Sequence, residues 1–286
     1  MRTIEMNAPP SAPVMYLRAL RTAGKSPGAV TALPALTYVR PRVVLDAEHV
    51  GRYASLCGFV PAQGVPLTYP QLLTFPLVMQ FIGSADCPWP AMGTVHLANA
   101  IEQQALLRAG EAVRVEMSTG RLLAHEKGQA FSLELRILRD GQAVWQGTQT
   151  LLRIGVQQVS GEPYSSRLGN DQPLSRQADI AVAGNIGRRY GRISGDMNPI
   201  HMSALSARLF GFRRAIAHGL WTQARALAAL LPALPVDQAA VAVEFKSPLF
   251  LPAQASLWTT RSAGRAWFEV RDAKGQRPHL RGELSR

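Results

Sequence analysis

The sequence predicts an α+β fold in which an antiparallel sheet wraps a central helix, and it predicts this unit twice. An order of short helix, loop, long helix and about four strands runs through the chain two times. Residues 51–59 also align with residues 188–196, matching an Arg-Tyr pair and a following Gly. A chain of 286 residues, 47% hydrophobic and 17% charged, is long enough to fill two such cores.

The first round follows an N-terminal arm over residues 1–40, which is rich in Pro and Ala and holds one helical candidate at 14–22. A helix is predicted over residues 46–57, because Asp46 can cap it. Residues 67–83 are apolar enough for a buried helix, kinked or broken near its internal proline.

Four strands are predicted after these helices, separated by glycine turns. The last two form a hairpin at Asp140-Gly141. The predicted strands cover residues 94–101, 112–119, 130–138 and 143–154.

A polar stretch over residues 155–178 predicts a linker to the second round. The predicted helices of that round cover 184–194, 204–210 and 219–231, and its strands cover 241–245, 255–260, 266–271 and 279–283. The segment before His201 contains Pro199 and is not expected to be regular helix. The chain is thus divided into an arm (1–40), a first domain (41–154), a linker (155–178) and a second domain (179–286).

The formal net charge is +12 and the sequence pI is near 10.6, so a nucleic acid or another polyanion is a conceivable ligand. Residues 151–286 carry +9 of this charge and residues 1–150 carry +3. The chain has no run of five basic residues, no aromatic-interleaved RNA-binding pattern and no zinc-finger spacing. These observations favour a small polyanionic ligand over nucleic acid.

The two cysteines, Cys57 and Cys87, are expected to be reduced thiols in a cytoplasmic protein, and no metal site is expected. Residues 1–34 lack the apolar run of a signal peptide. Residues 53–85 carry no charge, but four prolines interrupt them, so a buried core is expected rather than a membrane span.

The strongest chemical pattern is Asp196-Met197-Asn198-Pro199-Ile200-His201, in which a carboxylate and an imidazole stand five residues apart. Pro199 biases the backbone before it away from α-helix, so both side chains can turn toward one point. Such a pair can hold and deprotonate a water molecule, and general acid-base assistance is worth about 10²- to 10⁴-fold in rate.

Ala217-His218-Gly219 stands at the start of the longest predicted helix of the second round. Backbone N–H groups at a helix start are unpaired, and Gly219 lets a ligand approach them closely. A carbonyl oxygen that becomes an enolate would be stabilised there, as in an oxyanion hole. For His218 we favour a structural role.

The run SGDMNPIH, followed by HG seventeen residues later, strongly resembles the MaoC-like family of (R)-specific enoyl-CoA hydratases and 3-hydroxyacyl-thioester dehydratases. Its signature is YxxxSGDxNPxH with a downstream HG. The two-round layout is similar to the double hotdog members of that family, a likeness that extends over most of residues 40–286. Some single-hotdog members have a serine where this chain has Leu227.

The resemblance implies a hydro-lyase of fatty acid metabolism that reversibly adds water to trans-2-enoyl thioesters, giving (R)-3-hydroxyacyl thioesters. Asp196 and His201 would activate water, Asn198 would hold the loop, and the Gly219 N–H would bind the thioester oxygen. No cofactor is implied beyond coenzyme A or acyl carrier protein as the substrate's carrier. The carrier's negative charge would meet four basic residues: Arg208, Arg213, Arg214 and Lys246.

The first domain lacks the acid-base pair, since Phe59 and Gly64 stand at the positions of Asp196 and His201. We expect this domain to cover the acyl chain, with Leu72 and Leu73 influencing chain length. Two other functions stay open: a hotdog acyl thioesterase, and a non-catalytic protein that binds acyl-CoA or nucleic acid. A homodimer is a further possibility, because two fused copies can pair again.

Overall fold

The computed structural model describes residues 2–25, 28–166, 168–169 and 172–286. The chain forms two compact units. Unit 1 comprises residues 1–45, 70–100 and 111–166, and unit 2 comprises residues 46–69, 101–110 and 167–286. The predicted arm and linker include positions outside the described residues, and the domain boundaries given above stay predictions.

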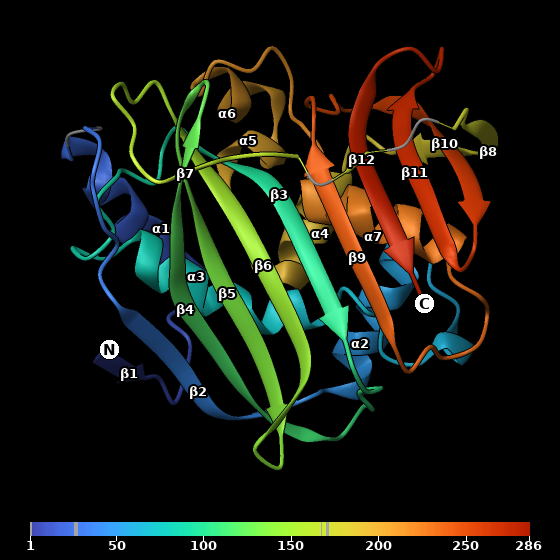
Figure 1. Cartoon of the computed structure of the whole chain (residues 1–286), viewed down its shortest axis with the longest axis horizontal. Coiled ribbons are helices and arrows are strands. Elements are labelled where there is room, and N and C mark those ends of the chain that lie inside the picture. Colours follow the sequence, from blue (N-terminus) through green and yellow to red (C-terminus); the bar gives the residue numbers. More distant parts are fainter. Residues whose placement is uncertain (1, 26–27, 167, 170–171) are drawn as a thin grey trace. The chain divides into compact units, whose positions relative to one another are not determined.

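Unit 1 is a sheet packed on one long helix. Its strands pair in the order β1-β2-β4-β5-β6-β3, with β7 beside β4, and helix α3 packs against β2, β4 and β5 (Figure 1). The elements are β1 (Arg2–Glu5), α1 (Ala12–Arg21), η1 (Thr22–Gly24), β2 (Leu36–Val44), α3 (Pro70–Ile82), β3 (Thr94–Gln103), β4 (Ala112–His125), β5 (Gly128–Arg139), β6 (Gln142–Ile154) and β7 (Glu162–Pro163).

Helix α3 is apolar around its circumference and supplies the core of unit 1. Leu77 and Phe81 are fully buried. Pro76 lies inside the helix but does not break it, so the break considered from the sequence does not occur. An internal proline costs about 3 kcal/mol, and burying two or three large apolar side chains offsets that cost.

The predicted hairpin is confirmed, because Arg139 of β5 faces Gln142 of β6 across a two-residue turn. Asp140 and Gly141 have φ values of 52° and 78°, as a type I′ turn requires. The turn fixes the register of β5 on β6.

Unit 2 is a second sheet with its own helix, α7, which packs against β12. Its strands pair in the order β9-β12-β11-β10-β8 (Figure 1). The elements are α2 (Ala47–Cys57), η2 (Pro61–Gln63), β8 (Ser175–Val182), α4 (Ile186–Ser194), α5 (Pro199–Met202), α6 (Ala204–Arg208), α7 (Gly219–Leu230), β9 (Ala239–Phe245), β10 (Ala253–Ser262), β11 (Arg265–Asp272) and β12 (Pro278–Ser285).

The two sheets have equivalent strand orders, β2-β4-β5-β6-β3 and β8-β10-β11-β12-β9. In each round one strand precedes the helices and then pairs with the second of the four strands that follow them. This is the α+β double hotdog fold that the sequence predicts.

The two leading strands, β2 and β8, were not predicted from the sequence. Pro41 interrupts the pattern of β2, and the structure accommodates it with a register shift between Arg40 and Val43. β8 ends its sheet and is mostly exposed over residues 175–179, so its polar sequence does not alternate as a half-buried strand does.

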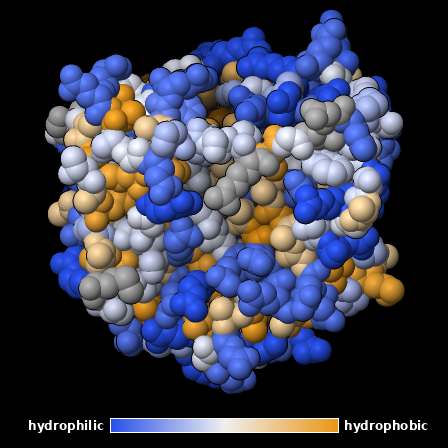
Figure 2. Space-filling view, viewed as in Figure 1, coloured by the Kyte–Doolittle hydropathy of each residue, from blue (hydrophilic) through white to orange (hydrophobic). Residues whose placement is uncertain are grey.

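No helix in the described part of the chain is long and apolar enough to cross a membrane. Cys57 and Cys87 are separate buried thiols. On the face shown in Figure 2, apolar side chains form several patches separated by polar residues.

Candidate functional site

The end of α4 directs Asp196 out of the helix. Gly195 follows Ser194 with a φ of 79°, a left-handed conformation that commonly ends helices and that glycine adopts without strain. The N–H of Asp196 donates to Ser194 Oγ at 3.2 Å. The carboxylate therefore projects from a turn, and its side chain is 27% exposed.

Two glycines on α4 let the site loop lie directly on the helix. A Cβ at Gly187 would stand 2.0 Å from the carbonyl oxygen of His201, and one at Gly191 would stand 2.7 Å from that of Asp196. These glycines are four residues apart and so share one face of α4. That face has no side chains to hold residues 196–201 away.

The loop between Asp196 and His201 closes on itself through short side chains. Asn198 N–H donates to Asp196 Oδ1 at 3.2 Å, and Ile200 N–H donates to Asn198 Oδ1 at 3.3 Å. Residues Pro199–Met202 form the short helix α5, contrary to our expectation of irregular backbone. A helix tolerates proline at its first position, where the missing N–H has no intrahelical partner, and Asn198 before it is extended.

The His201 imidazole has a defined orientation. Its Nδ1 lies 2.8 Å from the carbonyl oxygen of Ile216, so Nδ1 carries the proton and donates, which leaves Nε2 with a free lone pair. The ring is buried, and burial lowers its pKa, while Asp196 and the Ile216 carbonyl act in the opposite direction. His201 is therefore neutral at neutral pH and able to accept a proton.

His218 connects the carboxylate to the His201 ring. Its Nε2 donates to the backbone carbonyl of Asp196 at 2.9 Å and lies 3.7 Å from Asp196 Oδ2. Its ring stacks on that of His201, with centroids 3.6 Å apart. Burial and the neighbouring His201 lower the His218 pKa to about 3, so this ring stays neutral. His218, for which we favoured a structural role, thus contacts both residues of the pair, and its stack on His201 was not anticipated from the sequence.

Asp196, His201 and His218 are the described residues that could together offer ligand atoms to a metal ion, all within 4.8 Å of one another. Stacked imidazoles direct their in-plane lone pairs alongside each other rather than toward one point. One nitrogen of each ring is also engaged with a backbone carbonyl. The cluster is thus arranged better for acid-base chemistry than for tetrahedral metal binding.

Helix α7 begins beside this cluster, with His218 as its N-cap and Gly219 as its first residue. The first N–H groups of a helix have no intrahelical acceptor, so they can bind a developing oxyanion. A Cβ at Gly219 would lie 2.7 Å from the ring of Phe245, so any other residue there would displace that ring or the start of the helix. Leu227, about two turns along, is fully buried.

The four basic residues expected to meet a carrier have different surroundings. Arg208, Arg213 and Arg214 are exposed. Arg213 and Arg214 both stand over the ring of Phe250, at 4.6 and 5.8 Å from its centroid. Lys246 instead forms an ion pair of 2.9 Å with Glu244, whose side chain is 7% exposed, so its charge is already matched.

Helix α2 supports the site from within unit 2, a contact not anticipated from the sequence. His49 Nε2 lies 2.9 Å from the carbonyl oxygen of Ile193 on α4, and its Nδ1 lies 3.0 Å from the hydroxyl of Tyr69. The rings of Tyr53 and Tyr190 are 6.3 Å apart. The alignment of residues 51–59 with 188–196 pairs these two tyrosines and was the one signal that could have indicated the contact.

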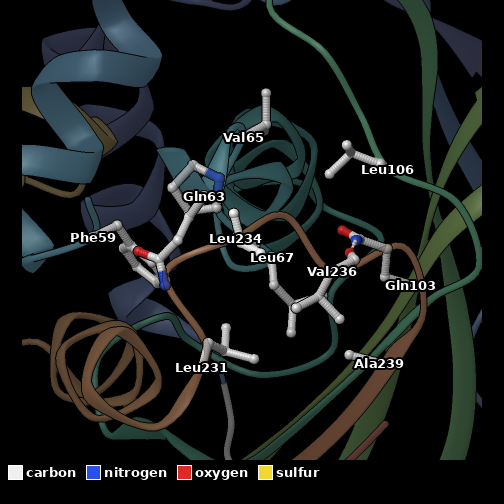
Figure 3. A pocket seen from close by; sticks show the side chains of 11 residues that line it. Phe59, Gln63, Val65, Leu67, Gln103, Leu106, Leu231, Leu234, Val236 and Ala239 are labelled. Carbon is white, nitrogen blue, oxygen red and sulfur yellow. Dashed lines mark hydrogen bonds between the residues drawn. The ribbon is translucent and has the colours of Figure 1, made fainter. Parts of the chain in front are cut away.

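An apolar pocket is lined by Leu231, which follows the C-terminal end of α7, whereas His218 of the cluster is the N-cap of that helix. Figure 3 shows the side chains that line the pocket. Gln63 and Gln103 are engaged by the carbonyl oxygens of Pro232 and Val236, which leaves the pocket surface largely apolar. Leu72 and Leu73, expected to influence chain length, do not line it. Its lining residues are Phe59, Gln63, Val65, Pro66, Leu67, Gln103, Leu106, Leu231, Leu234, Val236 and Ala239.

Comparison with known proteins places these features in context. Residues 168–281 match the model of the MaoC like domain. The chain is 33% identical over 248 residues, 87% of its length and 88% of the relative's, to 3-hydroxyacyl-thioester dehydratase X of Mycobacterium tuberculosis. A crystal structure of HtdX from that organism has a TM-score of 0.74 at 31% identity, covering 87% of this chain and 98% of the other. A MaoC-like dehydratase from Phytophthora capsici shares the fold, with a TM-score of 0.75 at 18% identity and coverage of 90% and 96%.

Proposed function

The chain belongs to the MaoC-like dehydratase family and is a hydro-lyase, and on that basis we propose that Asp196 and His201 carry its reaction. The reaction is the reversible addition of water to a trans-2-enoyl thioester, which gives the (R)-3-hydroxyacyl thioester. The observation that supports this assignment best is the orientation of His201. Its Nδ1–H is held by Ile216 O, and a ring nitrogen of His201 lies within 4.8 Å of a carboxylate oxygen of Asp196.

In the hydration direction, a water molecule is held between His201 Nε2 and the carboxylate of Asp196. His201 accepts one proton of the water while the oxygen bonds to C3 of the substrate. The electron pair of the C2–C3 double bond moves toward the thioester carbonyl, whose oxygen gains negative charge. That oxygen is bound by the N–H of Gly219 at the start of α7.

The second step returns the proton. The His201 imidazolium, stabilised by the adjacent carboxylate, gives its proton to C2 as the carbonyl re-forms, and the neutral imidazole is restored. Dehydration is the same path in reverse. Because His218 stays neutral, the cycle needs only one ring that changes charge, and that ring is His201.

The test is the loss of the conjugated enoyl-thioester absorbance with crotonyl-CoA and a medium-chain trans-2-enoyl-CoA. We expect turnover by the wild-type protein, its loss in His201→Ala while the fold is retained, and an (R)-alcohol product. An (S)-alcohol, or full activity in His201→Ala, would contradict the proposal.

Hydrolysis of the thioester is the main alternative, since the same pair could direct water at the carbonyl carbon instead of C3. The two reactions differ in their products. Hydrolysis releases free thiol, which a thiol reagent detects in the same cuvette, and hydration does not. Release of thiol at the rate of absorbance loss would favour the thioesterase.

A further inference from the structure

The segment that follows His201 exposes two leucines. Leu205 is 74% exposed and Leu209 is 78% exposed, the two highest values among the large apolar side chains of the described residues. They lie four residues apart on α6 and its C-cap, and so they share one face. Arg208, which lies between them in the sequence, is also exposed. An apolar pair of this kind is unfavourable in water unless a partner covers it.

The charge around these leucines is one-sided. Residues 180–236 contain seven arginines and a single acidic residue, Asp196. In the described part of the chain, Arg208, Arg213 and Arg214 have no carboxylate within ion-pair distance. Arg213 and Arg214 stand together over Phe250 although they carry the same charge. Unmatched cations held side by side fit an anionic partner.

This surface is joined rigidly to the site. Helix α6 starts three residues after His201, and Ser206 Oγ donates to the carbonyl of Pro199 at 2.7 Å. Ala207 of α6 is fully buried, and its carbonyl accepts from Phe212 N–H at 3.1 Å. A partner that binds here therefore has a fixed position relative to the Asp196–His201 loop.

We propose that Leu205, Leu209, Arg208, Arg213 and Arg214 form a docking surface for an acyl carrier protein. The partner is a small acidic protein whose surface combines carboxylates with apolar side chains. The inference rests on the proposed function, because it identifies the carrier of the same thioester. The phosphates of coenzyme A would satisfy the arginines, but the nucleotide offers no apolar surface for two leucines. A helix of acidic and apolar residues satisfies both groups at once.

The test compares one acyl group on two carriers. Initial rates are measured with the crotonyl thioester of a purified bacterial acyl carrier protein and with crotonyl-CoA, for the wild type, Leu205→Gln/Leu209→Gln and Arg208→Glu. Exposed leucines and an exposed arginine can be replaced without affecting the core. Matched controls are Leu20→Gln and Arg21→Glu on α1, whose side chains are also exposed.

We expect kcat/KM for the carrier-protein thioester to fall about tenfold in both site variants, because residues central to an interface contribute most of its binding energy. The value for crotonyl-CoA stays within about twofold in Leu205→Gln/Leu209→Gln, and the controls match the wild type on both substrates. Added salt lowers the wild-type rate on the protein substrate more than on crotonyl-CoA.

Each contrary result has a different meaning. Equal losses of Leu205→Gln/Leu209→Gln on both carriers, or no loss on the protein thioester, would overturn the docking surface while leaving the hydratase assignment standing. A dimer of the wild type that Leu205→Gln/Leu209→Gln dissociates would instead make this surface an interface between copies of the chain. Absence of wild-type turnover on either substrate, with no binding of the acyl carrier protein by calorimetry, would reject the proposed function and this inference together.

Discussion

The ring of His218 stacks on the ring of His201, with centroids 3.6 Å apart and planes inclined by 27°. Two stacked imidazoles cannot both be protonated without strong repulsion. Burial lowers the pKa of His218 to about 3, so His201 is the ring left to gain and lose a proton. The role of His218 is then to position the carboxylate segment and to stay neutral.

Removing the hydrogen-bonding nitrogens of His218 tests that role. In His218→Phe the ring stack is preserved, but the bond to the Asp196 carbonyl is lost. We expect kcat to fall about tenfold with KM within about twofold, because the change affects the placement of the reacting groups rather than uniform binding. Steady-state kinetics beside the control His125→Phe measure this. A rise in KM with kcat unchanged would show that His218 affects substrate binding instead.

The buried histidines also predict a pH dependence of stability. A histidine whose pKa is lower in the folded than in the unfolded state is protonated more readily when unfolded, so stability decreases as pH falls below about 6.5. For His218, the free energy of unfolding should decrease by about 2 kcal/mol between pH 8 and pH 5. Urea unfolding of the wild type and His218→Phe measures the difference. Equal pH dependence of the two proteins would show that His218 is not held neutral by the fold.

Gly219 is a position at which one methyl group should abolish activity. A Cβ there meets the Phe245 ring at 2.7 Å, and overpacking of this kind costs about 1–3 kcal/mol and moves the backbone. We expect Gly219→Ala to fold with lower stability and to lose most turnover. Gly219→Ala/Phe245→Leu, which makes room for the methyl group, should recover stability and part of kcat. Full activity of Gly219→Ala would show that the start of α7 accepts a Cβ without moving the N–H of residue 219.

The pocket at the C-terminal end of α7 predicts a chain-length effect. Helix α7 has 12 residues and so is about 18 Å long, and only a long acyl chain that starts near Gly219 could reach Leu231. We expect Leu231→Trp to leave turnover of crotonyl thioesters unchanged and to reduce that of long-chain thioesters several-fold. Leu20→Gln serves as the control. An unchanged chain-length profile would mean that the acyl chain does not enter this pocket.

Much of the fold could be predicted from the sequence, because periodicity and glycine turns mark the helices and most strands. Two of the strands that were missed, β2 and β8, show where those signals fail. Pro41 interrupts β2 at a register shift, and β8 lies at a sheet edge where polar residues face solvent. Both strands were missed because the local pattern does not show strand pairing. In the structure β2 pairs with β4, and β8 pairs with β10 at the equivalent place.

The candidate site was predictable in its residue types but not in its contacts. The spacing of Asp196 and His201 indicated a pair, whereas the stacked ring of His218 depends on how α7 meets the loop. Likewise the support from His49 joins residues 144 positions apart. Contacts of this range are set by tertiary packing, which no short motif encodes.

The most direct test of the central assignment is the rate of water addition to crotonyl-CoA or its carrier-protein thioester by Asp196→Asn. Asparagine keeps the size of Asp196 and an oxygen that can accept from Asn198 N–H, and it removes the negative charge and one acceptor oxygen. Asp237→Asn, an exposed carboxylate of the same unit, is the control. We predict that Asp196→Asn folds with near wild-type stability and loses about 10²-fold or more in kcat, while the control is unaffected. Wild-type turnover by Asp196→Asn would contradict the account.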